Sequence, residues 1–351
     1  MRVLVAMSGG VDSSMAAALL AEEGHDVTGV HLKMASTPSG LGGKGCCTLD
    51  DARDARRVAD RLGIPFYVWD FSAAFSERVV TDFVAEYAAG RTPNPCVRCN
   101  ERVKYAALLD RARAVGFDAL ATGHHVRLRR DRDGRMRMLR AADRAKDQTY
   151  VLYMAGQQQL AATRWPAGEH PKADLRSMAA ERGLPTAAKA DSHDICFIPS
   201  GDLGGFLRPR LGHRAGVFVD PSGKAVGRHD GAYRFTVGQR RGLGMAGFDA
   251  PLYVTAVDGD RVHVGPREAL EVEEVLAENV SWVAGSPPRE AVTAQVRYGG
   301  EALACELAAE TTRRVRVTFT HDRPAGVAPG QAVVFYAGDE CLGGGTITGA
   351  R

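Results

Sequence analysis

Residues 3–24 read VLVAMSGGVDSSMAAALLAEEG, and this stretch decides the fold. It begins with a short apolar run, VLVAM, which predicts a buried strand. The turn SGGVDSS follows, and MAAALLAEEG then has the composition of a helix that ends at Gly24. A glycine-rich turn between a strand and a helix suits a sheet covered by helices, and it can bind an anion.

Strand-like and helix-like segments continue to alternate through the first half of the chain. Further strands are predicted at 26–34, 64–70 and 117–125, and helices at 50–63, 75–90 and 103–116. This alternation predicts an α/β fold, a doubly wound parallel sheet with helices on both faces. Ligands bind such sheets beyond the carboxyl ends of the strands, where SGGVDSS, the region after HLKM and ATGHH all lie.

From about residue 204 the pattern changes to short strands joined by turns rich in glycine and proline. The stretch from 216 to 244 is typical of this pattern, and segments such as RVRVTFT after residue 266 are spaced like strands of a small barrel. We therefore expect three parts, an α/β domain at 1–203, a small β-rich domain at 204–265 and a C-terminal β-barrel at 266–351.

Composition limits the class of protein. The 351 residues are 45% hydrophobic and 25% charged, with a net charge of only +3, as in an ordinary globular chain. The sequence has no apolar run long enough to span a bilayer, and its start has no signal-peptide pattern. These features and seven cysteines predict a cytoplasmic protein with free thiols and no membrane partner.

The turn after the first predicted strand suits a nucleotide. Gly9 and Gly10 let backbone amides approach an anion, and hydroxyl donors follow at Ser13 and Ser14. Asp12 suits the magnesium ion that a nucleotide carries. The turn lacks the Gly-Lys-Ser/Thr ending of a Walker A loop, so hydrolysis of a γ-phosphate is not indicated. A plain capped turn is the alternative.

SGGVDSS resembles the pyrophosphate-loop signature of the ATP pyrophosphatases. Enzymes of that superfamily cleave ATP between its α and β phosphates and adenylate an oxygen of their substrate. The resemblance therefore implies ATP and Mg²⁺ as ligands, but it does not select the substrate.

The cysteines narrow the chemistry. Cys96 and Cys99 lie one helical turn apart in TPNPCVRCNERVKY, residues 92–105. A structural zinc site needs four ligands, commonly two such pairs, and the chain has one pair. Zinc completed by distant residues and a redox pair stay open as alternatives. The third thiol, Cys196, lies in AKADSHDICFIPSGD, where it is either a buried core residue or a thiol presented by a loop. An adenylating loop together with several thiols favours sulfur transfer.

Six motifs resemble those of the bacterial tRNA-specific 2-thiouridylases, and they follow one another in family order over nearly the whole chain. They are RTPNPCVRCNERVKY, ATGHHV, KDQTYVLY, DSHDICFIPSGD, FTVGQRRGLG and FYAGDECLGGGTI. The resemblance implies an enzyme, a tRNA-uridine 2-sulfurtransferase that adenylates O2 of the wobble uridine and then places sulfur on C2. It implies as partners the tRNAs for Lys, Glu and Gln, with a cysteine desulfurase or a sulfur relay protein as persulfide donor.

The same resemblance assigns the catalytic cysteines. Cys196 is expected to carry the persulfide, and Cys99 to release or resolve it, with a Cys99–Cys196 disulfide as the product. Many family members have Asp at the position of Cys96, so this residue is expected to serve as acid/base or as a second resolving thiol. An iron–sulfur cluster on Cys96, Cys99 and Cys196 is a further alternative.

The resemblance also assigns the binding residues. Those expected around ATP are Ala6, Met7, Ser8, Gly9, Gly10, Val11, Asp12, Ser13, Leu32 and Gly123. Those expected to contact tRNA are Asn94, Pro95, Cys96, His124, Lys146, Asp147, Gln148, Arg297, Tyr298 and Gln331. The remaining cysteines, Cys46, Cys47, Cys305 and Cys341, have no assigned role.

One basic segment stands apart from the motifs. Residues 127–140, RLRRDRDGRMRMLR, contain seven arginines and two aspartates around an Asp-Gly turn. We interpret it either as a solvated hairpin or as a basic ribbon that faces phosphates. Two other functions remain open from the sequence: another pyrophosphate-loop enzyme of tRNA modification, and an RNA-binding module stabilised by a metal.

Overall fold

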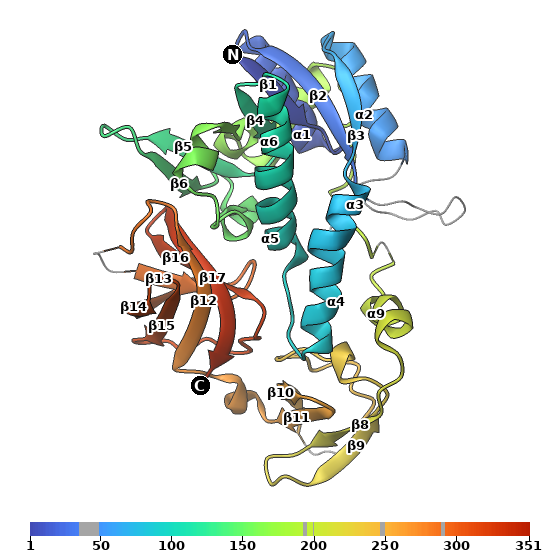
Figure 1. The fold of residues 1–351 in the computed structure, drawn as a ribbon, viewed down its shortest axis with the longest axis vertical. Coiled ribbons are helices and arrows are strands. Elements are labelled where there is room, and N and C mark those ends of the chain that lie inside the picture. Colours follow the sequence, from blue (N-terminus) through green and yellow to red (C-terminus); the bar gives the residue numbers. More distant parts are fainter. Residues whose placement is uncertain (35–48, 192–194, 199, 246–249, 289–291) are drawn as a thin grey trace.

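The computed structural model describes residues 1–34, 49–191, 195–198, 200–245, 250–288 and 292–351. Cys46 and Cys47 lie outside these residues. Within them the chain forms an α/β domain, a small sheet and a barrel (Figure 1). Within them, too, no helix has both the length and the apolar character that a membrane crossing requires.

The first sheet is parallel throughout and has the strand order β3-β2-β1-β4-β7. Its bounds are β1 (Arg2–Ala6), β2 (Asp26–Lys33), β3 (Phe66–Asp70), β4 (Ala119–Thr122) and β7 (Thr163–Arg164). Val3 and Val5 pack on one face with α1 (Val11–Glu22), α2 (Leu49–Leu62) and α8 (Lys172–Glu181). Leu4 packs on the other face with residues 97–112. The predicted doubly wound sheet is confirmed.

The helices after β3 begin earlier or run longer than predicted. The first series is α3 (Ser72–Phe75), the π-helix η1 (Ser76–Val80) and α4 (Thr81–Ala88), and the second is α5 (Pro95–Cys99), the π-helix η2 (Asn100–Leu108) and α6 (Leu109–Ala114). A helix starting at residue 103 is therefore wrong, because Asn94 caps a helix whose first residue is Pro95. Likewise α1 begins at Val11 and not at residue 15, because Gly10 already occupies the N-cap position.

Four short elements lie within the α/β domain, between β4 and α8. They are η3 (Arg144–Lys146), η4 (Thr149–Val151), α7 (Gln157–Ala161) and η5 (Pro166–Glu169). A helix that the sequence pattern did not reveal, α9 (Leu203–Leu211), follows. It is capped by Asp202, whose Oδ1 accepts from the Gly205 amide at 2.8 Å, and Phe206 packs near Phe83 of α4. Its two glycines and Pro209 hide the helical pattern.

The middle sheet has the order β10-β11-β8-β9. Its strands are β8 (Gly216–Val219), β9 (Ala225–His229), β10 (Tyr253–Asp258) and β11 (Arg261–Gly265), with η6 (Ala232–Arg234) before β10 and η7 (Arg267–Leu270) after β11. Phe218, Phe235 and Val254 form its core.

The C-terminal strands close into an antiparallel barrel in the order β12-β15-β14-β13-β16-β17, because β12 also pairs with β17. They are β12 (Glu274–Trp282), β13 (Val292–Gln295), β14 (Leu303–Thr311), β15 (Arg314–Phe319), β16 (Ala332–Ala337) and β17 (Glu340–Ala350).

A hairpin from the α/β domain extends the sheet of this barrel. It consists of β5 (Val126–Arg130) and β6 (Met136–Arg140), and β6 pairs with β17 through Leu139–Glu340 and Met138–Cys341. The hairpin itself was predicted as one reading of the arginine-rich segment. Its pairing with a strand about two hundred residues later was not.

Candidate active site

The loop between β1 and α1 is shaped by its own hydroxyl groups. The Ser8 amide donates to Ser13 Oγ at 3.1 Å, and the Ser13 and Ser14 hydroxyls donate to the Gly10 carbonyl at 3.1 and 2.9 Å. Gly9 has a φ of +78°, which side chains with a Cβ rarely adopt. Because Gly10 has no side chain, it leaves the first amides of α1 uncapped, and these amides can bind an anion.

The neighbouring elements approach this loop closely. A Cβ at Gly123, just after β4, would lie 2.5 Å from the Ser13 amide nitrogen, and one at Gly9 would collide with the Asp51 carbonyl of α2. Ala6 ends β1, Met7 is buried beside it, and Leu32 is buried in β2. The residues predicted to surround ATP therefore lie together at the carboxyl ends of β1, β2 and β4.

Asp12, in the first turn of α1, is held by Lys172 and His125. Lys172 Nζ donates to both carboxylate oxygens at 2.7 Å, and His125 Nε2 lies 3.0 Å from Oδ1. Burial opposes ionisation of Asp12, but the contacts with His125 and Lys172 outweigh it and lower the pKa of the carboxyl. Nothing in the sequence pointed to Lys172, because it lies 160 positions after Asp12 and belongs to none of the six motifs.

Asp191 joins Lys172 to two further cations. It accepts from Lys172 Nζ at 2.9 Å, Lys146 Nζ at 3.0 Å and Arg176 at 2.8 Å. Burial raises the pKa of Asp191, but the bonds to Lys172 and Lys146 lower it well below its usual range. Asp191 was also missed, although it begins the DSHDICFIPSGD motif. Lys172, which binds Asp12 of the loop, and Lys146, in the segment expected to contact tRNA, thus share one carboxylate.

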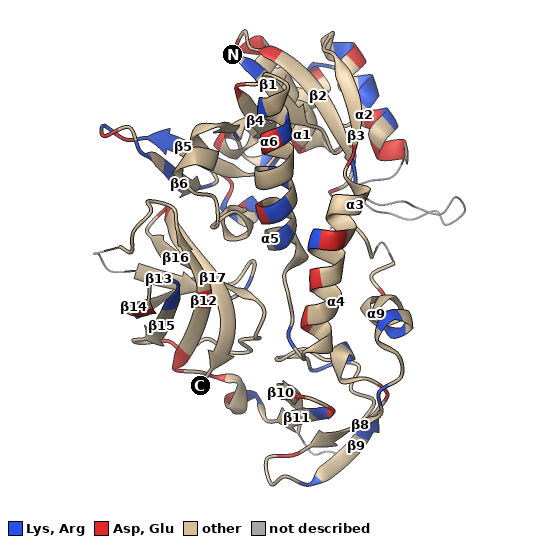
Figure 2. Ribbon diagram, viewed as in Figure 1, with Lys and Arg blue, Asp and Glu red and all other residues tan. Residues whose placement is uncertain are grey.

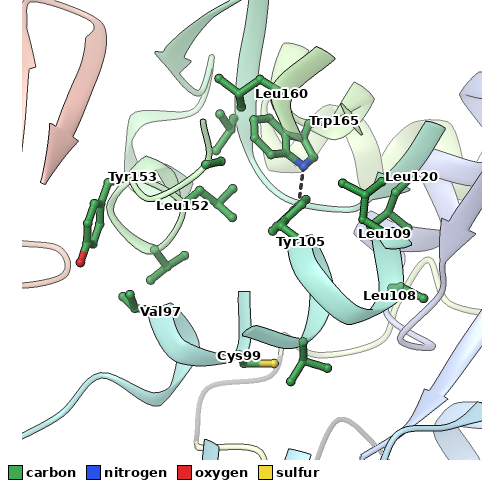
Figure 3. Close-up of a cluster of buried hydrophobic side chains, with 14 of the residues drawn as sticks. Val97, Cys99, Tyr105, Leu108, Leu109, Leu120, Leu152, Tyr153, Leu160 and Trp165 are labelled. Atoms are coloured by element: carbon green, nitrogen blue, oxygen red, sulfur yellow. Dashed lines mark hydrogen bonds between the residues drawn. The ribbon is translucent and has the colours of Figure 1, made fainter. Parts of the chain in front are cut away.

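Helix α5 presents the cysteine pair. Asn94 Oδ1 accepts from the amides of Cys96 at 3.0 Å and Val97 at 3.4 Å, and Pro95 fills the first helical position. Cys96 is exposed, whereas Cys99, one turn later, is buried among Val97 and its neighbours (Figure 3). The helix therefore separates the two thiols into different surroundings.

Cys99 lies at the same edge of the sheet as the loop. Its Sγ is 3.9 Å from Sδ of Met34, the residue that follows β2. Cys196 is partly buried and packs against the same hydrophobic cluster, and its neighbour Phe197 contacts the rings of Phe75 and Phe83 at 5.7 and 5.1 Å. The two thiols expected to react thus share one core.

The iron–sulfur alternative finds no support in the described part of the chain. There, no group of three or more His, Cys, Asp or Glu side chains is arranged to hold a metal. Cys96 is exposed while Cys99 is buried, and a cluster on Cys96, Cys99 and Cys196 stays a prediction.

The predicted tRNA contacts around β4 take part in internal bonds. His124 Nδ1 lies 2.6 Å from the Thr122 hydroxyl and 3.1 Å from the Tyr105 hydroxyl, which also accepts from Trp165 Nε1 at 2.7 Å (Figure 3). Gln148 Oε1 accepts from the His125 amide at 2.9 Å.

Asp147 is also engaged internally. It accepts from Arg140 at 3.0 Å and from the Thr149 hydroxyl at 2.6 Å. The Lys146 side chain is 39% exposed, and its bond to Asp191 raises its pKa. Of this segment, Lys146 is the residue best placed to meet a phosphate.

The barrel carries two further residues predicted to contact tRNA, and one of them, Tyr298, lies near Asp147 and Cys96. Arg297 is exposed, and the Tyr298 ring is half exposed, 6.0 Å from the ring of Tyr150. Burial raises the pKa of Tyr298, and the nearby charges of Asp147 and Cys96 raise it further. Tyr298 therefore lies near Cys96, and the assignment of both to tRNA binding stays a prediction.

Gln331 has a hydrogen-bond partner within the chain, and its assignment to tRNA binding stays a prediction. Its Nε2 donates to the Thr92 carbonyl at 2.9 Å, and the Thr92 amide donates to the Pro329 carbonyl at 2.7 Å. The barrel thus holds the chain two residues before Asn94. In this structure Gln331 supports the segment that carries Cys96.

Acidic residues neutralise much of the arginine-rich hairpin. Arg127 pairs with Asp339 at 3.0 Å, Arg129 with Glu169 at 2.6 Å, Arg140 with Asp147, and Arg137 with Glu340. Figure 2 shows acidic residues interleaved with the basic ones at this hairpin. The arginines of this hairpin that are left for a basic surface are those near its tip, Arg130, Arg132 and Arg135.

Comparison with known proteins adds the following matches. Three family profiles match in succession: a tRNA methyl transferase HUP domain at residues 1–200, a tRNA methyl transferase PRC-barrel domain at 204–266 and an aminomethyltransferase beta-barrel domain at 272–347. The chain is 52% identical to the tRNA-specific 2-thiouridylase MnmA of Thermobifida fusca, over 99% of this chain and 95% of that one. It is 54% identical to the protein of the same name from Frankia alni, over 99% of each.

Among solved structures, a 4-thiouridine synthetase–RNA complex with bound ATP is 14% identical and covers 60% of this chain and 50% of that one, with a TM-score of 0.37. That likeness is too remote to bear on function.

Proposed function

Because the chain belongs to the family of tRNA-specific 2-thiouridylases, we propose that it activates the wobble uridine of tRNA with ATP and then thiolates it from a cysteine persulfide. The chain is a tRNA sulfurtransferase whose first domain is of the ATP-binding pyrophosphate-loop class. The observation that best supports the proposed mechanism is that the loop at residues 8–14 and Cys99 both lie beyond the carboxyl ends of adjacent strands, β1 and β2.

The first step activates an oxygen that leaves poorly. O2 of the uridine attacks the α-phosphorus of ATP, pyrophosphate departs, and the base carries an AMP ester at O2. The uncapped amides at the start of α1 and the hydroxyls of the loop stabilise the phosphate charge during this step. The base must leave the anticodon stack to reach the loop.

The second step delivers sulfur. A persulfide donor first transfers a sulfur atom to Cys196, forming Cys196–S–SH. Cys99 thiolate attacks Cys196 Sγ, so that a Cys99–Cys196 disulfide forms and sulfide is released next to the activated base. The sulfide adds to C2, AMP leaves with the original O2, and 2-thiouridine is formed. A thiol reductant then supplies two electrons and two protons to restore both cysteines.

Magnesium accompanies the nucleotide in this proposal. Asp12 fits it as an oxygen donor, because its lowered pKa keeps the carboxylate ionised and its side chain is 30% exposed. When bound, the ion would neutralise phosphate charge. Asp12 must then exchange at least one contact with Lys172 for the ion.

The tRNA meets residues from more than one part of the chain. We propose that Lys146, Arg297 and Tyr298 contact the tRNA, with Tyr298 offering a ring to a base and the two cations meeting phosphates. Cys96, exposed beside Tyr298, takes the position of an acid/base group for the base. In this proposal the domains at 1–203, 204–265 and 266–351 act together on the tRNAs for Lys, Glu and Gln in the cytoplasm.

Single-turnover assays test the proposal. Unmodified tRNA transcript, ATP and a persulfide source are mixed with the protein, and pyrophosphate and 2-thiouridine are measured. We expect Cys99→Ala and Cys196→Ala to release about one pyrophosphate per bound tRNA but to form no 2-thiouridine. Cys305→Ala, in the barrel, is the matched control and should thiolate normally. Full activity of Cys196→Ala, or 4-thiouridine as the product, would contradict the mechanism.

A further inference from the structure

We infer that Lys172 is a phosphate-binding residue of the ATP site. When the nucleotide binds, the ammonium of Lys172 leaves Asp12 and binds the β and γ phosphates. The inference rests on the proposed use of ATP at the loop formed by residues 8–14. It assigns a role to a side chain outside the loop and outside the six sequence motifs.

The position of Lys172 is fixed by its helix. It is the first residue of α8, and its amide donates to Asp143 at 3.1 Å. Leu175 and Ala179 of α8 are buried in the same cluster as Ala16 and Ala17 of α1. Because two packed helices set the distance, the ammonium reaches the start of α1 and not some other part of the surface.

The environment of this ammonium is unusual for a structural ion pair. Lys172 is only 8% exposed, and its three contacts, at 2.7, 2.7 and 2.9 Å, all go to carboxylate oxygens of Asp12 and Asp191. It lies at the N-terminal ends of both α1 and α8, where helix dipoles favour anions and disfavour cations. Burying a cation there costs free energy that two carboxylates offset.

A nucleotide explains the arrangement better than stability does. The loop amides and the N-terminus of α1 already favour an anion, and Lys172 adds a positive charge within hydrogen-bond reach of that loop. When Asp12 binds Mg²⁺, Lys172 loses its two hydrogen bonds to Asp12 and keeps the third contact, with Asp191. Its free donors then face the phosphates that leave as pyrophosphate.

Arg176 offers a matched control. It binds the same Asp191 oxygen at 2.8 Å and also donates to the Ala187 carbonyl, but among the described residues it makes no hydrogen bond or ion pair with Asp12. Removing Arg176 therefore disturbs the shared carboxylate without removing the cation at the loop.

Equilibrium binding without tRNA tests the inference. Calorimetry with Mg·ATP, AMP and pyrophosphate is compared for the wild type, Lys172→Met, Lys172→Arg and Arg176→Met. We expect Lys172→Met to bind ATP and pyrophosphate at least tenfold more weakly and AMP within twofold of the wild type, because only the β and γ phosphates lose a partner. Lys172→Arg should restore most of the ATP affinity, and Arg176→Met should bind all three ligands within twofold of the wild type.

The outcomes separate this inference from the proposed function. Unchanged ATP affinity in Lys172→Met, or an equal loss for ATP and AMP, would overturn the role of Lys172 and leave the sulfur chemistry standing. If the wild type bound no ATP at all, the proposed function would fall and this inference with it. Lys172→Gln, which keeps a donor for Asp12 without the charge, replaces Lys172→Met if that variant does not fold, and the same affinities decide.

Discussion

Burial sets the charge of single side chains throughout the site, and His124 is the clearest case. Burial lowers its pKa well below the usual 6.5, and the nearby positive charges of Lys104 and His125 lower it further. Its partner Tyr105 has a pKa raised by burial to about 12. Both rings are therefore neutral in the folded protein at neutral pH.

This shift predicts how stability depends on pH. The pKa of His124 is lower in the folded protein than in the unfolded chain, so protonation favours unfolding. Its contribution is complete above pH 6.5 and is lost as the pH falls from there towards the folded pKa, by at most about 1.4 kcal/mol per pH unit.

Urea unfolding between about pH 5 and pH 7.5 should show this loss in the wild type. In His124→Gln the dependence on pH should be flatter, and the exposed His213→Gln should keep the wild-type slope. Equal slopes in the wild type and in His124→Gln would contradict a neutral, buried His124.

The cysteines differ for the same physical reason. Burial raises the pKa of both Cys305 and Cys341 to about 12, so their thiols stay protonated. Because the thiolate is the nucleophile, these two cysteines do not compete for the persulfide. The sequence alone shows seven cysteines, and burial removes two of them from the chemistry.

Among the elements, the start of α5 governs the cysteine pair. Asn94 caps the helix, Pro95 opens it, and Cys96 follows in its first turn. The cap therefore positions the exposed thiol as well as the backbone.

Two substitutions at this helix should have opposite effects on stability. Asn94→Ala removes the cap and should lower the free energy of unfolding by about 1 kcal/mol. Cys96→Asp places a negative charge at the helix N-terminus and should raise the free energy of unfolding by about 0.3–1 kcal/mol. Urea unfolding measures both, and thiolation by Cys96→Asp should persist, because a carboxylate can also transfer a proton. Inactivity of a folded Cys96→Asp would show that the thiol itself is needed.

In the whole molecule, the parts predicted as separate domains are joined at specific points. Strand β6 pairs with β17 of the barrel, and Arg98 of α5 lies between Asp82 of α4 and Thr346 of β17. Thr92 contacts both the barrel, through Pro329 and Gln331, and the middle domain, through the Thr236 hydroxyl at 3.2 Å. These joints surround the segment that carries Cys96.

The junction between hairpin and barrel predicts coupled unfolding. Met138, fully buried in β6, packs in the cluster that includes Val334 and Tyr336 of the barrel. Met138→Ala should therefore cost roughly 2–5 kcal/mol. Trp fluorescence and far-ultraviolet circular dichroism should report one shared transition in the wild type. Arg132→Ala, at the hairpin tip, is the control and should change stability by less than about 0.5 kcal/mol. A barrel that unfolds independently in the wild type would contradict this coupling.

Local sequence determined the parallel sheet, the loop at residues 8–14 and the three candidate thiols. The spacing of apolar residues in strands and helices, and a glycine-rich turn, can each be recognised within a few consecutive residues. Local patterns misplaced the starts of α1 and α5 and missed α9, where caps and glycines decide. Only the tertiary structure brought Lys172 and Asp191 to Asp12, placed Gln331 on Thr92 and joined β6 to β17. Those contacts join residues far apart in the chain, so the local spacing of apolar and polar residues cannot predict them. They depend on how packed helices and strands set the distances between side chains.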